Sequence, residues 1–117
     1  MPYVDGFVLA VPTDKLEEYK QMARTAGAIW KEYGALAYVE CLADDVPYGE
    51  LTSFPRAVQA KDNETVVFSW IVYESRKSRD EINEKVMADP RLKMEPAAMP
   101  FDGKRMIFGG FTTMLQL

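Results

Sequence analysis

The sequence predicts an α+β fold in which one antiparallel sheet of four strands carries two helices on one face. Three observations predict this fold. Four apolar segments rich in Val, Ile, Leu and Phe are typical of strands. Two segments between them repeat apolar residues every three or four positions, which is the period of an amphipathic helix. The elements follow the order strand, helix, strand, and after a long connection the same order occurs again.

The first half of the chain contains a strand, a long helix and a second strand. Residues 3–11 are rich in Val, Phe and Leu and stop at Pro12. Asp14 and Glu17 have capping-box spacing and predict the start of the helix, which Gly34 ends. Residues 36–43 form the second strand. The apolar stripe of the helix consists of Leu16, Tyr19, Met22, Ala23, Ala26, Ile29, Trp30 and Tyr33.

The second half repeats this order. Residues 66–73 combine Val, Phe, Trp and Ile and give the clearest strand of the chain. Ser78 and Glu81 repeat the capping-box spacing at the start of the second helix, and the pair Asp89-Pro90 ends it or starts a short new turn. Residues 106–115 form the last strand.

This βαββαβ order is the ferredoxin-like arrangement, and we expect residues 1–117 to form one domain of this kind. Two connections, residues 44–65 and 88–105, are longer than such a fold needs. We therefore expect each connection to hold a short strand, an arm or a functional lid. Val58 and Ala60 are candidates for an extra edge strand in the first connection.

Composition excludes several classes of function. The chain has no histidine, which excludes a Ser-His-Asp triad, a Cys-His pair and histidine-ligated zinc or haem. We expect no cofactor and no metal. The adjacent acids Asp44 and Asp45 are the candidate for a metal site, but they are more typical of a solvated turn, because no further potential ligands cluster with them. The net charge of −4 disfavours nucleic acid and anionic membranes, and no apolar segment is long enough to span a bilayer. The single cysteine, Cys41, indicates a reducing, cytoplasmic location and is expected to be a buried thiol.

Both faces of the predicted sheet are apolar. In residues 66–73, for example, Phe68 and Trp70 point to one face while Val67 and Ile71 point to the other. Two helices cover one face, and a bare apolar sheet face exceeds the patch that a soluble monomer tolerates. We therefore expect a homodimer in which two copies stack sheet to sheet. The alternative is that the long connections fold back over the second face.

Five residues are candidates for a ligand site: Tyr38, Glu40, Arg56, Trp70 and Arg105. Trp70 and Tyr38 are aromatic residues that either fill a core or line a pocket. Glu40, if it faces inward, is a potential proton acceptor. The alternative, which we favour, is a structural ion pair of Glu40 with Arg56 or Arg105. These arginines lie in the long connections, where a guanidinium also binds carboxylate or phosphate ligands.

Five motifs give the chain a specific resemblance. They are MPYVDGFV (residues 1–8), ELTSFPRA (50–57), TVVFSW (65–70), VMADPR (86–91) and MPFDGKRMI (99–107). Through them the chain resembles the YbaA-like family of uncharacterised bacterial proteins along nearly its whole length. The resemblance implies the dimeric α/β-barrel superfamily, in which two ferredoxin-like units stack their sheets into a joint barrel. It implies no activity.

Three functions remain open at this point. The first is a soluble homodimer that binds a small apolar or aromatic metabolite in a pocket. The second is a cofactor-independent enzyme of the monooxygenase or isomerase kind, which the superfamily resemblance permits. The third is a structural or interaction protein without a ligand. For the first function, we expect the pocket near Trp70, with Glu40 or an arginine at its mouth to receive a small aromatic or amphipathic acid.

Overall fold

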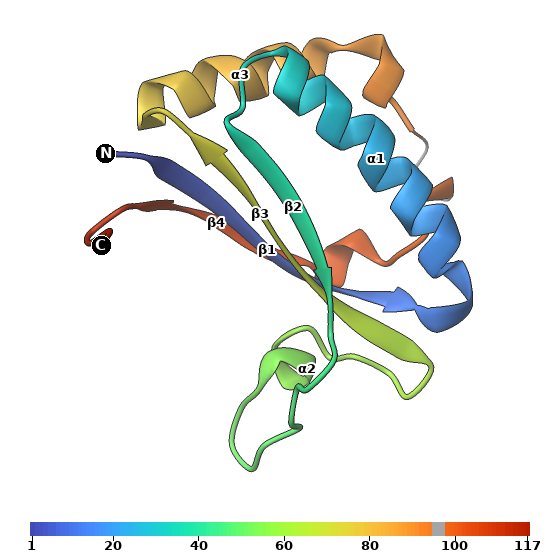
Figure 1. Ribbon diagram of the computed structural model, residues 1–117. Coiled ribbons are helices and arrows are strands. Elements are labelled where there is room, and N and C mark those ends of the chain that lie inside the picture. Colours follow the sequence, from blue (N-terminus) through green and yellow to red (C-terminus); the bar gives the residue numbers. More distant parts are fainter. Residues whose placement is uncertain (95–97) are drawn as a thin grey trace.

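The computed structural model describes residues 1–94 and 98–117 and has the predicted βαββαβ order (Figure 1). The four strands form one antiparallel sheet in the order β2-β3-β1-β4, so the α+β, ferredoxin-like fold is confirmed. In this order the strands from the two ends of the chain are neighbours. The helices and strands are β1 (Tyr3–Pro12), α1 (Leu16–Glu32), β2 (Ala37–Leu42), α2 (Phe54–Ala57), β3 (Glu64–Tyr73), α3 (Arg76–Ala88) and β4 (Ile107–Thr112).

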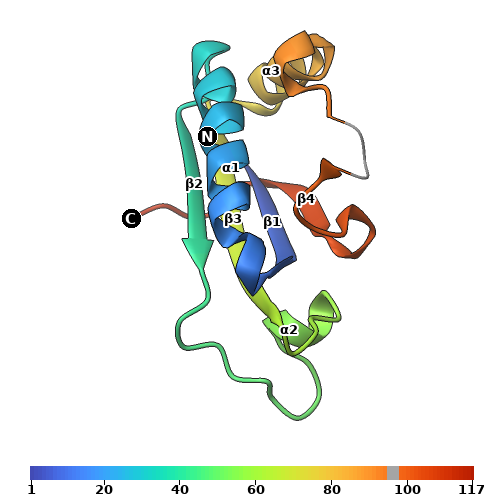
Figure 2. The same ribbon diagram turned by 90° about the vertical axis from the view of Figure 1, so that its right-hand side faces the viewer.

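Helices α1 and α3 lie on the same face of the sheet, with α1 crossing in front of the strands (Figure 2). The core between them is built from alternate residues of the two central strands, because successive strand residues point to opposite faces. Leu9 and Val11 of β1 and Val67 and Tyr73 of β3 are among the fully buried side chains of this layer. Val86 of α3 is buried against the same core. No described helix combines the length and the hydropathy that a membrane crossing requires.

The structure confirms the predicted end of α1 and corrects the predicted N-terminal caps of α1 and α3. Gly34 follows α1 with φ +117°, and the backbone N–H groups of Gly34 and Ala35 donate to Lys31 and Trp30, as in a Schellman motif. The cap expected at Asp14 is wrong, because residues 13–15 form a 3₁₀ turn and α1 begins without a side-chain cap. The cap expected at Ser78 is also wrong. Ser75 caps α3 instead, accepting a hydrogen bond from the Ser78 N–H.

A buried ion pair ties α3 to β1. The Arg79 guanidinium donates to the Asp5 carboxylate, with a shortest N–O distance of 2.9 Å. The Asp5 side chain is 7% exposed and that of Arg79 is 20% exposed, so the pair lies under the helix. Such charges are held in a folded chain when they are paired and hydrogen-bonded. This contact fixes where α3 rests on the sheet.

The two long connections have different structures. Residues 43–63 form an arm that carries α2 and reaches across one end of the sheet (Figure 1). The extra strand expected at Val58 and Ala60 is wrong: Val58 ends α2 and is buried against Val8, Ala10 and Val66. The second connection lies on the helical side, where residues 90–92 and 103–105 form 3₁₀ turns.

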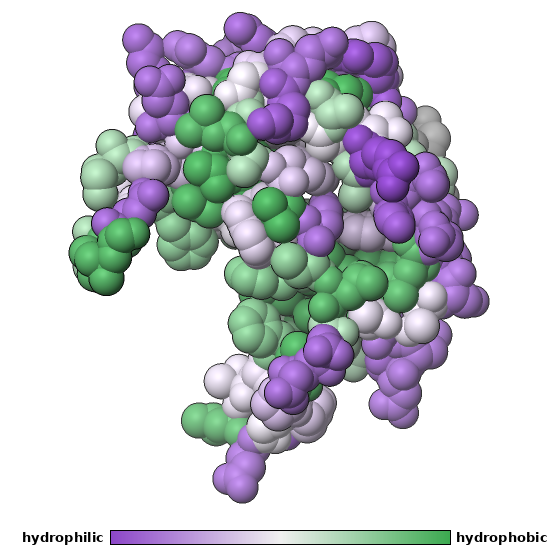
Figure 3. Space-filling model, in the orientation of Figure 1, coloured by the Kyte–Doolittle hydropathy of each residue, from purple (hydrophilic) through white to green (hydrophobic). Residues whose placement is uncertain are grey.

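The sheet face opposite the helices is apolar and largely open in the single chain. The pairing register directs Val39, Phe68 and Phe111, on three different strands, to this face. Phe68 is 44% exposed and Phe111 is 63% exposed. Hydrophobic residues gather in the hollow between the sheet and the arm (Figure 3). The arm covers one end of this face, and both faces of the sheet are apolar, as the strand sequences predict.

Candidate functional site

A cavity of about 530 Å³ lies on the helical side of the sheet. Its walls come from β1, β2 and β3, from α1 and α3, and from the connection that follows α3. Five of the seven methionines of the chain line it, and we call it the methionine cavity. Thioether side chains are flexible and polarisable, so they adapt to ligands of different shape. The five methionines are Met22, Met87, Met94, Met99 and Met106.

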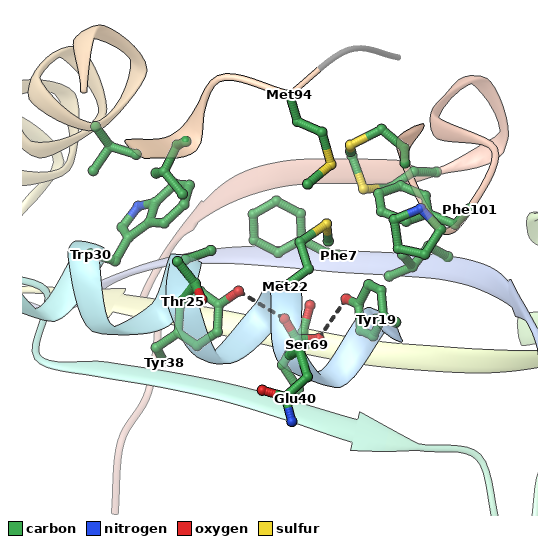
Figure 4. A pocket seen from close by; sticks show the side chains of 18 of the residues that line it. Phe7, Tyr19, Met22, Thr25, Trp30, Tyr38, Glu40, Ser69, Met94 and Phe101 are labelled. Atoms are coloured by element: carbon green, nitrogen blue, oxygen red, sulfur yellow. Dashed lines mark hydrogen bonds between the residues drawn. The ribbon is translucent and has the colours of Figure 1, made fainter. Parts of the chain in front are cut away.

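The Glu40 carboxylate interrupts this largely apolar wall, which also includes the charged residues Glu18 and Arg91. Tyr19 of α1 donates its hydroxyl proton to Glu40 Oε1 at 2.7 Å, and Tyr38 of β2 donates to Glu40 Oε2 at 2.9 Å. Figure 4 shows the Glu40 carboxylate between the two tyrosines, with Phe7 and Met22 nearby. Among the described residues, Glu40 has no ion-pair partner. We call Tyr19, Glu40 and Tyr38 the tyrosine–glutamate cluster.

Local geometry positions each member of the cluster. Tyr38 and Glu40 are two residues apart in β2, so both side chains point to the helical face. Tyr19 is buried on the side of α1 that faces the sheet. Gly27 of α1 makes room for the Tyr38 ring, because a Cβ atom at this glycine would lie 2.6 Å from the ring atom Cδ1.

Burial and the neighbouring carboxylate keep both tyrosines protonated. Burial is the largest cause that raises the pKa of Tyr19 well above its usual value, and the charge of Glu40 adds to the effect. The same causes, in the same order, raise the pKa of Tyr38. Both hydroxyls are therefore hydrogen-bond donors throughout the physiological pH range.

The cluster also borders a second cavity, of about 590 Å³, between α1 and β2. Tyr19, Tyr38 and Glu40 line both cavities. The rest of the second cavity is more charged, because it includes four exposed charged side chains of α1, whereas the methionine cavity includes one, Glu18. We call it the outer cavity; its charged lining residues besides Glu40 are Glu17, Lys20, Arg24 and Lys31.

The structure places the predicted site residues in different regions. Tyr38 and Glu40 meet at the methionine cavity. Trp70 borders this cavity along β3, but its ring packs against Phe68 on the open face, with 5.4 Å between ring centroids. Trp30 of α1 is the tryptophan beside Tyr38, at a centroid distance of 6.1 Å.

Neither predicted arginine reaches the cluster. Arg56 donates to the backbone oxygens of Tyr48 and Gly49 within the arm. Arg105 donates to both carboxylate oxygens of Glu64, at 2.8 and 2.6 Å. The favoured ion pair of Glu40 with Arg56 or Arg105 is therefore wrong. The tyrosine hydroxyls provide the hydrogen bonds that Glu40 needs, and no guanidinium of these two arginines stands at the cavity.

Several residues of the site were not predicted from the sequence. The helical spacing places Tyr19 in the apolar stripe of the helix. This is correct for its ring, but the spacing does not show that its hydroxyl donates to Glu40. Gly27 gave no signal, because its role depends on a ring from another element. The sequence carries a signal for the methionines, because four of the five recur near the second helix and the second long connection. Asp44 and Asp45 do not join a larger group, since the described residues contain no cluster of three or more potential metal ligands.

Two solved structures resemble the chain in fold. An uncharacterised NIPSNAP domain protein from Burkholderia xenovorans has a TM-score of 0.58 and 16% identity, over 95% of this chain and 93% of that chain. A dimeric ferredoxin-like protein from an uncultured marine organism has a TM-score of 0.58 and 12% identity, over 100% of both chains. At these identities the likeness shows the ferredoxin-like fold alone.

The similarity in sequence to other proteins is much stronger. Over 115 residues, which are 98% of each chain, the protein is 56% identical to the uncharacterised protein YbaA of Escherichia coli strain K12. It has the same identity, over the same share of each chain, to the uncharacterised protein YbaA of Shigella flexneri. The family model described as "Protein of unknown function (DUF1428)" matches residues 2–103. The chain therefore belongs to the DUF1428 family, whose function is unknown, and the resemblance to YbaA-like proteins is confirmed.

Proposed function

We propose that the protein binds a small, neutral, apolar or aromatic molecule in the methionine cavity. The observation that carries this proposal is a carboxylate held by two tyrosine hydroxyls in the wall of an otherwise largely apolar cavity. Ligand pockets typically combine apolar walls with a few polar groups that orient the ligand. Here the apolar walls provide affinity, and the cluster orients the polar group of the ligand.

The charge of the cluster selects the ligand. The sequence favoured an aromatic or amphipathic acid, because an arginine was expected at the mouth of the pocket. Arg56 and Arg105 are bound elsewhere, and Arg91 at the cavity is paired with Glu32 and Asp89, so Glu40 would repel an anion. Each carboxylate oxygen has a lone pair left after it accepts one tyrosine hydroxyl, and each tyrosine oxygen can also accept. A hydroxyl or carbonyl group on an aromatic ligand matches this set.

A pair of probes of similar shape tests this proposal. We expect 2-naphthol to bind and 2-naphthoate, its anionic analogue, to bind at least about 10-fold more weakly, because the carboxylate would lie beside Glu40. Binding is measured by the fluorescence of Trp30, in a Trp70→Phe variant that leaves Trp30 as the single tryptophan. Glu40→Gln should weaken 2-naphthol binding by about 10-fold, because a hydrogen bond to a charged group is lost.

Two results would contradict ligand binding of this kind. Tighter binding of 2-naphthoate than of 2-naphthol would contradict the assigned polarity. If a wider set of neutral aromatic alcohols and ketones also leaves the Trp30 fluorescence unchanged, a structural or interaction role without a ligand replaces the proposal. Glu84→Gln is the matched control, because Glu84 is exposed on α3 and should not affect binding.

A second candidate function is a cofactor-independent enzyme of the isomerase or monooxygenase kind. The observation that favours it is the position of Glu40, a carboxylate acceptor beside two neutral hydroxyl donors at an apolar cavity. Proton transfer to a positioned carboxylate needs no cofactor. A binding protein and such an enzyme differ in one measurement, which is turnover of the bound molecule.

We also propose that two copies stack their open sheet faces to form a homodimer. Phe68 and Phe111 are exposed on this face in the single chain, and soluble monomers rarely expose apolar patches of such extent. A face of this kind resembles half of a core, as the interfaces of obligate dimers do. The fold neighbour described as a dimeric ferredoxin-like protein supports the proposal by analogy.

Light scattering tests the assembly. We expect a mass of about 27 kDa at micromolar concentration, twice the 13.3 kDa of the chain. Phe68→Glu should give the monomer, because it places a charge in the stacked interface. Phe108→Glu is the control, because Phe108 is also an exposed strand residue but lies on the helical face against Phe7. A wild-type monomer at this concentration would contradict the dimer.

Two broader properties complete the proposal. Residues 1–117 act as one domain, supported by the pairing of β1 with β4, which brings both ends of the chain into one sheet. The protein works in a reducing compartment such as the cytoplasm, supported by its single cysteine, which has no partner for an intrachain disulfide.

A further inference from the structure

Glu40 lies in the wall between two cavities of different character. The methionine cavity on one side is lined mainly by apolar side chains, with Glu18 and Arg91 among its lining, and the outer cavity on the other side includes four exposed charged side chains of α1. Both contain Tyr19, Tyr38 and Glu40 in their walls. A molecule in the methionine cavity and water in the outer cavity can therefore reach the same carboxylate.

This arrangement has the parts that proton abstraction next to a carbonyl group requires. The reaction needs a base for the C–H proton and a donor for the oxygen on which negative charge develops. Glu40 is the base in the cluster, and the two tyrosine hydroxyls are the donors. Burial and the charge of Glu40 raise the pKa of each tyrosine, so both stay protonated when they act as donors.

We infer that the tyrosine–glutamate cluster catalyses enolisation of small, neutral, mainly apolar ketones, and that Glu40 is the general base. This inference rests on the proposed function, because the ketone occupies the methionine cavity. In the complex, one tyrosine turns its hydroxyl from Glu40 to the carbonyl oxygen. Glu40 then has a free lone pair toward the α-carbon of the ketone.

The reaction needs no oxidant, reductant or cofactor. The Glu40 carboxylate takes the α-proton, the C–H electron pair forms a C=C bond, and the carbonyl π pair moves to the oxygen. The tyrosine hydroxyl donates a hydrogen bond to this enolate oxygen. Protonated Glu40 then returns the proton to the same carbon, or to the γ-carbon of a β,γ-unsaturated ketone, which shifts the double bond into conjugation. Exchange of the Glu40 proton with water occurs from the outer cavity.

Hydrogen–deuterium exchange of 2-tetralone tests the inference. This neutral bicyclic aromatic ketone has acidic protons at C1, and it is incubated with the full chain in D₂O. Proton NMR follows the loss of the C1 signal, and the fluorescence of Trp30 measures binding separately. We expect exchange in the presence of the protein at least about 100-fold faster than with Glu40→Gln, since a positioned general base contributes on this scale.

Two variants separate catalysis from folding and binding. Glu40→Gln should leave the Kd for 2-tetralone within a few-fold, because the ketone oxygen is bound by a tyrosine rather than by Glu40. Tyr38→Phe keeps the base and removes one donor, so exchange should fall by about 10- to 100-fold. The control variant Glu84→Gln, which changes an exposed residue of α3, should catalyse the exchange of 2-tetralone at the wild-type rate.

The outcomes distinguish this inference from the proposed function. Binding of 2-tetralone without faster exchange overturns the catalytic role and leaves the binding role intact. Equal exchange by the wild type and Glu40→Gln also overturns it, because another group is then the base. If neither 2-tetralone nor the neutral probes of the binding test bind, both the inference and the proposed function are wrong.

Discussion

At the scale of single residues, Glu40 shows how one side chain combines predictable and unpredictable properties. Its position on the same strand face as Tyr38 follows from the two-residue period of β2, so their proximity could be predicted from the sequence. Its second partner, Tyr19, lies 21 positions away on α1, and its approach depends on how the helix rotates over the sheet. The ion pair with an arginine failed for the same reason, because the sequence does not specify which groups from distant elements meet.

Gly27 gives a prediction at this scale. Replacing glycine by alanine inside a helix usually stabilises a protein by about 1 kcal/mol. Here the added Cβ would lie 2.6 Å from the Tyr38 ring, which is too close for contact. We therefore expect Gly27→Ala to destabilise the protein by about 1–3 kcal/mol, as overpacking does. Urea unfolding measures the change.

Ala28→Gly is the control for helix propensity. Ala28 is the next residue of α1 and is exposed, so this change should cost about 1 kcal/mol through propensity alone. If Gly27→Ala is instead more stable than the wild type, the Tyr38 ring moves away from the added Cβ atom at little cost, and the overpacking argument is wrong.

At the scale of elements, apolar runs and helical spacing predicted all four strands and the two long helices. These signals are strongest in β1, β3, α1 and α3, which contain the buried residues of the core, whereas β4 is exposed at nearly every position in the single chain. The predicted helix starts were wrong by one residue at α1, which has no side-chain cap, and by three residues at α3, which Ser75 caps, since several polar residues near each start have capping ability. Val58 is apolar because it anchors the arm, and an apolar residue in a connection does not distinguish this role from a strand.

The second long connection gives a prediction about pH. Glu64, at the start of β3, accepts two hydrogen bonds from Arg105, which lies near the end of this connection. The hydrogen bonds from Arg105 are the largest cause that lowers the pKa of Glu64 below its usual value of 4.5. Because the pKa is lower in the folded state, Glu64 stabilises the fold above about pH 4.5, and this contribution is lost as the pH falls through the folded value.

Glu64→Gln should therefore be less stable than the wild type at pH 7, and the difference should shrink as the pH falls below about 4.5. Urea unfolding at a series of pH values measures this difference. Glu84→Gln, which removes an exposed carboxylate, is the control and should follow the wild-type curve. A difference that stays constant from pH 7 to pH 3 would show that the Glu64 charge does not contribute to stability.

At the scale of the whole molecule, the open sheet face connects the strand sequences to assembly. Strands with apolar residues on both faces need two partners, and within one chain α1 and α3 cover one face. The arm covers one end of the other face by burying Val58 on it. The alternative in which the connections cover the second face is thus realised at this end, while Phe68 and Phe111 stay exposed on the same face.

The rate at which a reagent labels the Cys41 thiol shows whether the open sheet face is covered. Cys41 is half-buried in the single chain and pairs in register with Phe68, so its side chain points to the open face. If two copies stack there, a thiol reagent should label Cys41 slowly in the native wild type and rapidly in urea. The monomeric variant Phe68→Glu should be labelled faster than the wild type without urea, whereas Phe108→Glu, changed on the other face, should stay protected. Mass spectrometry measures the labelled fraction over time. Equal rates in the wild type and Phe68→Glu would mean that the fold of one chain alone protects the thiol, and that no second copy covers this face.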